Sequence, residues 1–363
     1  MTAIIFLIVL AILIFVHELG HFILARWNGI RVDEFKIGFG PRLISWGKGE
    51  TKYGLNLIPF GGYVKIYGEN PDEDSISGAD KDRSFVNKNR FQQVSVLVAG
   101  VFFNFLFAWL LYSLVFMTGI TATPDGFEKH ADQFKNERII ITYVNVGSPA
   151  DLAGLKVGDV IKTIDSRVTP TVEAIQNSIN SSQGKDIKLR YDRKGALEIE
   201  TSIVPVSGIV EDKYAIGIAM NKVVDMKLSF FESIYEGGYY TLFMMKETTL
   251  GLSDFFANIF KGTANFADVA GPIGIAGIVG DAADMGLTYL LMITALISIN
   301  LGIINLLPFP ALDGGRVLFV LIEGIIRRRI KPKYFNAVNT VGFILLMILM
   351  VVVTYKDVVK LIK

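Results

Sequence analysis

Long apolar runs, separated by two more polar regions, dominate the pattern of the chain. The runs cover residues 3–25, residues 94–120, a stretch that begins near residue 287, and residues 338–355. Each has about 18 residues or more, which is the length of a helix that crosses the hydrocarbon core of a bilayer. The pattern therefore predicts an α-helical polytopic membrane protein with about four transmembrane helices.

Three short strands are predicted in residues 30–69, at 32–39, 53–58 and 63–67, because β-rich segments alternate there with glycines. Such a small membrane-associated β-sheet is tolerated at membrane depth only where it is buried or lines a cavity. Two interpretations stay open. The free edge of the sheet pairs with an extended substrate segment, or the hairpin only fills space.

The third run carries Asn300 and Asn305 and then breaks at two prolines, which cannot continue a helix without losing backbone hydrogen bonds. Asp313 follows the break directly. A broken helix at membrane depth lines a cavity, so Asp313 is an ionisable residue placed at such a cavity. The second run carries Asn104, which either joins two helices or approaches the site.

The segment of residues 223–286 is less regular. Residues 226–260 are rich in aromatic side chains and predict helices that lie on the membrane surface. Residues 266–280 are rich in glycine and predict a loop packed against the helices. The first domain is expected at 1–120, and the second membrane half at 287–363.

Composition narrows the chemistry. The chain is 51% hydrophobic, has no cysteine and only 3 histidines, and carries a net charge of +1. The missing cysteine excludes disulfides, cysteine zinc sites and thiol nucleophiles. A charge near zero without a basic stripe gives no indication of nucleic-acid binding.

Two of the three histidines lie in the first run, at His17 and His21, with Glu18 between them. On a helix, residues four apart share a face, so the two imidazoles can converge on one metal ion. Glu18 lies about 100° around the helix, where it can take a proton from a metal-bound water without being a ligand. Two histidines in ordinary hydrogen bonds are the alternative. A third ligand would be His130, Asp or Glu, and a carboxylate is favoured because His130 lies in a polar segment.

Basic residues flank the first three runs, near residues 26–36, 88–90 and 327–333. The positive-inside rule then predicts that residues 26–93 and 310–337 face the cytoplasm, with residues 121–222 outside. Three lysines at the C-terminus argue mildly against this orientation.

Residues 121–222 resemble the core of a PDZ domain, with the helix of its peptide groove at residues 172–180. The resemblance rests on three short elements: Ser148-Pro149-Ala150, Ala153-Gly154-Leu155 and Gly158-Asp159-Val160-Ile161. It implies an inserted α+β domain that binds extended peptide by strand addition. Such a fold indicates binding or gating rather than chemistry.

Most of the chain resembles the site-2 proteases, and within them the bacterial RseP-like intramembrane metalloproteases. The resemblance rests on the histidine motif, the glycine-rich strands, the PDZ-like insert and the final motif that contains Asn305 and Asp313. It implies Zn²⁺ held by His17, His21 and Asp313, with Glu18 as the catalytic base. It also implies that Asn305 binds substrate, and Asn300 matches a second asparagine of the motif.

The sequence departs from the family pattern in two places. Val101 stands where the second span of the family usually has a proline, and there is room for one PDZ domain rather than a tandem pair. Gating by a paired PDZ module therefore does not transfer to this chain.

The expected function is hydrolysis of peptide bonds inside the transmembrane segments of single-span membrane proteins, such as anti-sigma factors or remnant signal peptides. The expected location is the cytoplasmic (inner) membrane, in contact with the lipid bilayer. The PDZ-like domain would meet the ectodomain or the C-terminus of the substrate. The alternatives are a catalytically inactive PDZ-bearing scaffold and a metal transporter, but the complete motif disfavours the first and the missing internal repeat the second.

Overall fold

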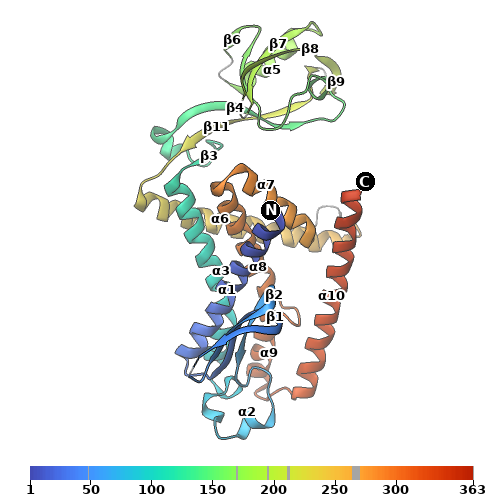
Figure 1. Cartoon of the computed structure of the whole chain (residues 1–363). Helices are drawn as coiled ribbons and strands as arrows, with labels where there is room; N and C mark the ends of the chain where they lie inside the picture. The colour runs from blue at the N-terminus through green and yellow to red at the C-terminus, as the bar shows by residue number, and fades with distance from the viewer. Residues whose placement is uncertain (48, 169–170, 194–195, 211–212, 264–269, 363) are drawn as a thin grey trace. The chain divides into compact units, whose positions relative to one another are not determined.

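The computed structural model describes residues 1–362 apart from 48, 169–170, 194–195, 211–212 and 264–269 (Figure 1). The chain divides into two compact units. One unit combines Met1–Val115 with Phe230–Lys363, and the other is Phe116–Ser229. The second unit is therefore inserted between the two halves of the first.

Four helices of the described chain are long and apolar enough to cross a membrane, which confirms the predicted number. They are α1 (Thr2–Trp27), α3 (Arg90–Thr118), α8 (Leu287–Leu306) and α10 (Pro332–Ile362). The first helix ends where predicted, since Gly29 follows it with a φ of 65°, a value that glycine adopts at little cost. The second begins at Arg90, four residues before the apolar run. It continues through Val101, so the missing proline leaves this helix unbroken.

Strands β1 (Val32–Trp46) and β2 (Lys52–Ile66) form the small sheet. Each strand pairs twice with the other. Phe35, for example, lies opposite both Val64 and Tyr53. The sheet thus has four antiparallel segments in the order 42–46, 52–56, 32–37 and 62–66. Residues 62–66 form one free edge, and this edge lies against α1.

The three predicted strands fall on β1 and β2, but the last two are parts of one continuous strand, and residues 42–46 were not predicted. Gly38, Gly40 and Gly61 have positive φ values of 84°, 83° and 95°. Glycine adopts these angles readily, so the backbone bends within each strand while its pairing continues. The short helix α2 (Glu73–Ser77) and two 3₁₀ turns follow the sheet, in a region predicted as a surface loop.

Residues 230–261 form one long helix, α6 (Phe230–Lys261). Its buried face is small and polar, whereas large side chains such as Phe231 and Tyr235 are exposed. Gly237 lies directly on α3, because a Cβ there would meet Ser113 Oγ at 2.3 Å. Trp109 of α3 also donates a hydrogen bond to the Ile234 carbonyl oxygen, at 2.8 Å. An apolar outer face and a small inner face are typical of a helix that packs against others within a lipid environment.

The loop predicted at residues 266–280 is wrong where the structure describes it. Helix α7 (Pro272–Met285) occupies most of this segment, and residues 266–269 lie outside the described residues. Proline is at the first helical position, where its missing N–H costs no hydrogen bond. The carboxylate of Asp357 accepts hydrogen bonds from the N–H groups of Gly271 and Gly274, at 3.2 and 2.8 Å. A carboxylate at a helix N-terminus stabilises it, and this one ties α10 to α7.

The predicted break after the third span is present. Helix α8 ends at Leu306, and α9 (Asp313–Ile326) begins after the two prolines. The turn is tight: a Cβ on Gly314 would lie 2.2 Å from the Leu306 carbonyl oxygen, and one on Gly315 would lie 2.1 Å from that of Phe309. Only glycine fits these positions. The break therefore places Asp313 at the start of α9.

The inserted unit is an α+β fold around a seven-stranded sheet, in which β6 pairs with β5 beside the path β3-β11-β4-β5-β7-β8. A separate hairpin joins β9 and β10. The strands of the inserted unit are β3 (Ile120–Ala122), β4 (Lys135–Val144), β5 (Val160–Ile164), β6 (Arg167–Val168), β7 (Ile187–Arg193), β8 (Ala196–Ile203), β9 (Val206–Val210), β10 (Lys213–Ala215) and β11 (Ile218–Met226). Helices α4 (Pro149–Leu152) and α5 (Val172–Ser181) complete the unit. A core of branched aliphatic side chains, including Ile141, Ile175 and Leu189, holds α5 to the sheet.

A cavity of about 440 Å³ lies between α5 and the start of β11. The β9-β10 hairpin contributes part of its wall. Its lining includes Gln176, Asn180, Tyr214, Gly217 and Met220. The groove helix predicted at residues 172–180 coincides with α5.

Candidate metal centre

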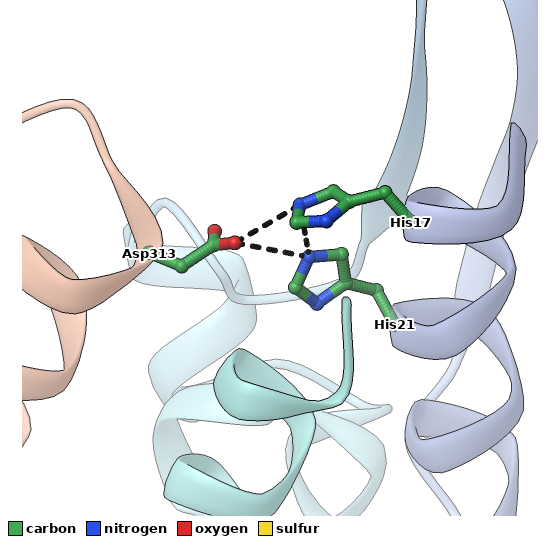
Figure 2. Close-up of side chains that lie close together, drawn as sticks. All are labelled: His17, His21 and Asp313. Atoms are coloured by element: carbon green, nitrogen blue, oxygen red, sulfur yellow. Dashed lines mark hydrogen bonds and ion pairs between the residues drawn. The ribbon is translucent and has the colours of Figure 1, made fainter. Parts of the chain in front are cut away.

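We call the unit that combines Met1–Val115 with Phe230–Lys363 the membrane unit. Three donor atoms from its two halves lie close together (Figure 2). His17 and His21 project from the same face of α1, one turn apart, and Asp313 projects from the first turn of α9. Asp313 Oδ2 lies 3.1 Å from His17 Nε2 and 3.3 Å from His21 Nε2, and the two Nε2 atoms are 3.2 Å apart. Both histidines are buried, with 8% of their surface exposed.

The triangle of donor atoms has the size that a tetrahedral zinc ion requires. Nitrogen and oxygen donors lie roughly 2.0–2.1 Å from zinc, so two donors of a tetrahedral ion are about 3.3–3.4 Å apart. The three separations fall within a few tenths of an ångström of this value. Two imidazoles and one carboxylate also form a common ligand set of catalytic zinc sites.

The hydrogen bond of His21 to Val96 leaves its other ring nitrogen available to bind a metal ion. Its Nδ1 donates to the Val96 carbonyl oxygen at 2.8 Å, and a carbonyl oxygen can only accept. The Nε2 atom of a neutral His21 therefore carries a lone pair, which faces the carboxylate oxygen of Asp313. Two lone pairs at 3.3 Å repel each other, and either a metal ion between the two atoms or a proton on Nε2 removes the repulsion.

Two glycines allow α1 and α3 to pack closely at this point. A Cβ on Gly20 would lie 2.5 Å from the Ala99 carbonyl oxygen. A Cβ on Gly100 would lie 2.4 Å from His21 Nε2 and 2.8 Å from His17 Nε2. The imidazoles therefore occupy the space that any side chain at Gly100 would need.

Glu18 lies beside the donors without joining them. Its Oε2 accepts a hydrogen bond from the backbone N–H of Val64 at 2.9 Å. Val64 belongs to the free edge of the sheet, where it pairs with Phe35 on the other side. The catalytic motif and the sheet edge are thus in direct contact.

The other candidate residues from the sequence, Asn300, Asn305 and His130, do not belong to the group of donor atoms. Asn300 donates to the Leu296 carbonyl oxygen of its own helix at 3.0 Å. Asn305 is half-buried, and its side chain makes no hydrogen bond to the described residues. His130 lies in the inserted unit, in the 3₁₀ segment Glu128–Gln133, and is not part of the cluster.

Sequence reasoning missed most of what α3 contributes. Val96, Gly100 and Asn104 are four residues apart, so they form one stripe on this helix. The Val96 carbonyl oxygen accepts a hydrogen bond from His21, and Gly100 packs directly against both imidazole rings. The amide nitrogen of Asn104 is 3.1 Å from His17 Nδ1. The signal was the four-residue spacing, which matches that of the two histidines on α1.

Comparisons with known proteins cover almost the whole chain. The model of peptidase family M50 matches residues 5–349. A protein of Clostridium acetobutylicum, named as a candidate zinc metalloprotease, is 36% identical over 96% of this chain and 94% of its own length. The zinc metalloprotease RasP of Geobacillus kaustophilus is 28% identical over 98% of this chain and 97% of its own length. The PDZ domain of an SdrC-like protein from Listeria innocua is 28% identical and covers 23% of this chain and 92% of its own, with a TM-score of 0.21.

Proposed function

Because the chain belongs to peptidase family M50, the site-2 proteases, and is a multi-pass zinc metalloendopeptidase, we propose that it hydrolyses peptide bonds inside the transmembrane segments of single-span membrane proteins. The observation that carries the proposal is the convergence of His17, His21 and Asp313 on helices of the membrane unit. Ionisable groups at membrane depth are costly and mark functional sites. Substrates in the membrane are the ones such a site can reach.

We assign the zinc ligands to His17 Nε2, His21 Nε2 and Asp313 Oδ2. The formal charges of the ion, of Asp313 and of an ionised Glu18 then sum to zero, which suits a membrane interior. When bound, zinc lowers the pKa of a coordinated water and polarises the carbonyl that is attacked. Three protein ligands leave one position open, as catalytic zinc sites require.

Glu18 is the proposed general base. Its carboxylate takes a proton from the attacking water and later delivers one to the nitrogen of the leaving amine. The Val64 N–H holds Oε2 in a fixed direction, so the carboxylate is positioned before substrate arrives. Asn305 is the proposed additional donor to the substrate, since its side-chain amide makes no hydrogen bond to the described part of the chain.

The free edge formed by residues 62–66 is the proposed site for the substrate backbone. A helical segment has its carbonyl groups hydrogen-bonded internally and must unwind before attack. An extended segment that pairs with this edge on either side of the Val64 N–H, which Glu18 already binds, would run past Glu18. This assigns the sheet a role in binding and goes beyond the space-filling interpretation.

The substrates we propose are single-span proteins already shortened outside the membrane, such as anti-sigma factors in regulated intramembrane proteolysis, or remnant signal peptides. The protein would lie in the cytoplasmic membrane with the inserted PDZ-like unit outside. That unit would hinder substrates that still carry a large ectodomain, or contact their new C-terminus.

Cleavage of a model single-span substrate by the purified chain in detergent tests this proposal, with the zinc content measured on each variant. Glu18→Gln keeps the shape of the side chain but removes the base, so we expect retained zinc and a loss of activity of about 1000-fold. Asp313→Ala removes a ligand, so both zinc and activity should be lost.

Asp281→Ala serves as the control, because it removes an exposed carboxylate of α7 outside the cluster. Cleavage by Glu18→Gln at the wild-type rate would exclude Glu18 as the base. A wild-type protein that purifies without zinc would point instead to an inactive scaffold.

A further inference from the structure

Asn104 is a fully buried polar residue of α3 that contacts a proposed zinc ligand. Its amide nitrogen lies 3.1 Å from His17 Nδ1. Its amide oxygen is buried and has no hydrogen-bond partner among the described residues. The backbone of Asn104 is anchored separately, because Ser298 of α8 donates to its carbonyl oxygen at 2.8 Å.

The identity of the amide atom that faces His17 decides which ring nitrogen carries the hydrogen. If the amide nitrogen donates, Nδ1 must accept, and a neutral ring then carries its hydrogen on Nε2. That hydrogen would point at Asp313, and Nε2 could not bind a metal. If the amide oxygen faces the ring, Nδ1–H donates to it and Nε2 presents a lone pair.

The two amide orientations have nearly the same shape and differ by a half turn of the amide group. In the orientation in which the nitrogen faces His17, the amide oxygen has no hydrogen-bond partner in the described structure, so no contact to that oxygen fixes this orientation. The metal decides between the two orientations, because ligation through Nε2 is compatible only with the orientation in which the oxygen faces Nδ1.

We propose that Asn104 is a positioning residue of the zinc site, whose amide oxygen accepts the Nδ1 hydrogen of His17. The proposal rests on the proposed zinc ligands. His21 has the equivalent contact, from Nδ1 to the Val96 carbonyl oxygen. The helix α3 thus sets the tautomer of both imidazoles, through a backbone acceptor for one and a side-chain acceptor for the other.

The expected effect is on metal affinity. Partners that orient a histidine ligand contribute roughly 10- to 100-fold to metal binding. Asn104→Leu keeps the size of the side chain but has no acceptor, so zinc affinity should fall by that factor. Asn104→Asp can only accept, so its affinity should stay within a few-fold of wild type.

Competition for zinc with a chelator, on the purified full-length protein in detergent, measures this directly. Thr294→Val is the matched control, since it removes a buried hydroxyl whose hydrogen bond, among the described residues, stays within α8, and we expect unchanged affinity. Thermal unfolding of the zinc-free variants shows whether each one folds.

Wild-type affinity in Asn104→Leu, or an equal loss in Asn104→Leu and Asn104→Asp, would overturn the proposal. The failure of the zinc site itself has a different signature, because the wild-type protein would then bind no zinc at all.

Discussion

Gly100 shows how strongly one missing side chain shapes the metal centre. A methyl group there would overlap both Nε2 atoms, so the imidazole rings would have to move. We expect Gly100→Ala to displace the imidazoles and to reduce bound zinc at least about 10-fold, a loss on the scale of disturbing a ligand's support. Metal analysis of the purified variant measures the loss.

The matched control is Gly277→Ala, another helical glycine, on α7, where a Cβ meets no atom within 4 Å. This variant should keep its zinc. A Gly100→Ala protein with full zinc occupancy would mean that the rings are not packed against α3.

Spacing along the sequence was enough to bring His17 and His21 together, because a helix puts residues four apart on one face, and to place Glu18 beside them. Asp313 needed the broken helix and the resemblance to a family as well. Asn104 could not be assigned, because it is 87 residues from His17 and its role depends on which helix it faces. A polar residue in an apolar helix indicates a contact but does not name the partner.

At the level of elements, a substitution of Val64 tests the proposed role of the free edge of the sheet. Its N–H points away from the ladder and toward Glu18. Val64→Pro removes this N–H without removing a ladder hydrogen bond, since proline is tolerated where the N–H faces outward. We expect zinc to stay bound and kcat/KM to fall about 10- to 100-fold, the usual range for a hydrogen bond to a charged group.

Val64→Ala keeps the N–H and separates the loss of the donor from the loss of the side chain. It should cleave the substrate at close to the wild-type rate. Equal activities of Val64→Pro and Val64→Ala would show that this edge contributes neither to the base nor to substrate binding.

In the inserted unit, an ion pair joins strands β3, β4 and β11. Both terminal guanidinium nitrogens of Arg138 donate to the carboxylate of Asp225, each at 2.9 Å, and Thr121 donates to it at 2.6 Å. Hydrogen bonds from Arg138 hold the pKa of Asp225 well below its usual range. A carboxylate whose pKa is lowered by folding stabilises the fold above its unfolded pKa and loses this effect as the pH falls.

We therefore expect Asp225→Asn to destabilise the unit near pH 7 and to make it less sensitive to acid below about pH 4. The Asp225 side chain is 35% exposed, so solvent screening limits the loss to roughly 1 kcal/mol. Hydrogen exchange of peptides from β3 and β11 in the full-length protein measures this loss of stability. Glu137→Gln breaks the more exposed pair with Lys222 and should change little, whereas equal effects of the two variants would contradict the expectation.

The error at α7 has a physical cause. Glycine in an irregular segment indicates turns, but in a helix that packs against other helices it allows close approach. Gly280 packs on Thr2 at the start of α1, where a Cβ would meet Thr2 Cγ2 at 2.3 Å. The sequence shows the small residue and does not show which of the two uses applies. The bends within β1 and β2 were missed because glycine can either end a strand or bend it, and here it bends the strand.

For the whole molecule, the length of the apolar runs was sufficient to predict the helices that can cross a membrane. Four runs predicted the helices that can cross a membrane, because in lipid every backbone group must be satisfied within the segment. Contacts between distant segments, such as that of Asp357 with the start of α7, could not be predicted. They depend on packing, which hydropathy does not record.

The proposed zinc ligands lie 296 residues apart at their extremes, on either side of the inserted unit. A ribosome makes the two histidines and the base long before the aspartate. Until Asp313 is made, the growing chain has only two of its three donors. On the proposed ligand set, a chain that stops before Asp313 cannot assemble the centre, so the cell's membrane proteins meet the protease only after the inserted unit has been made.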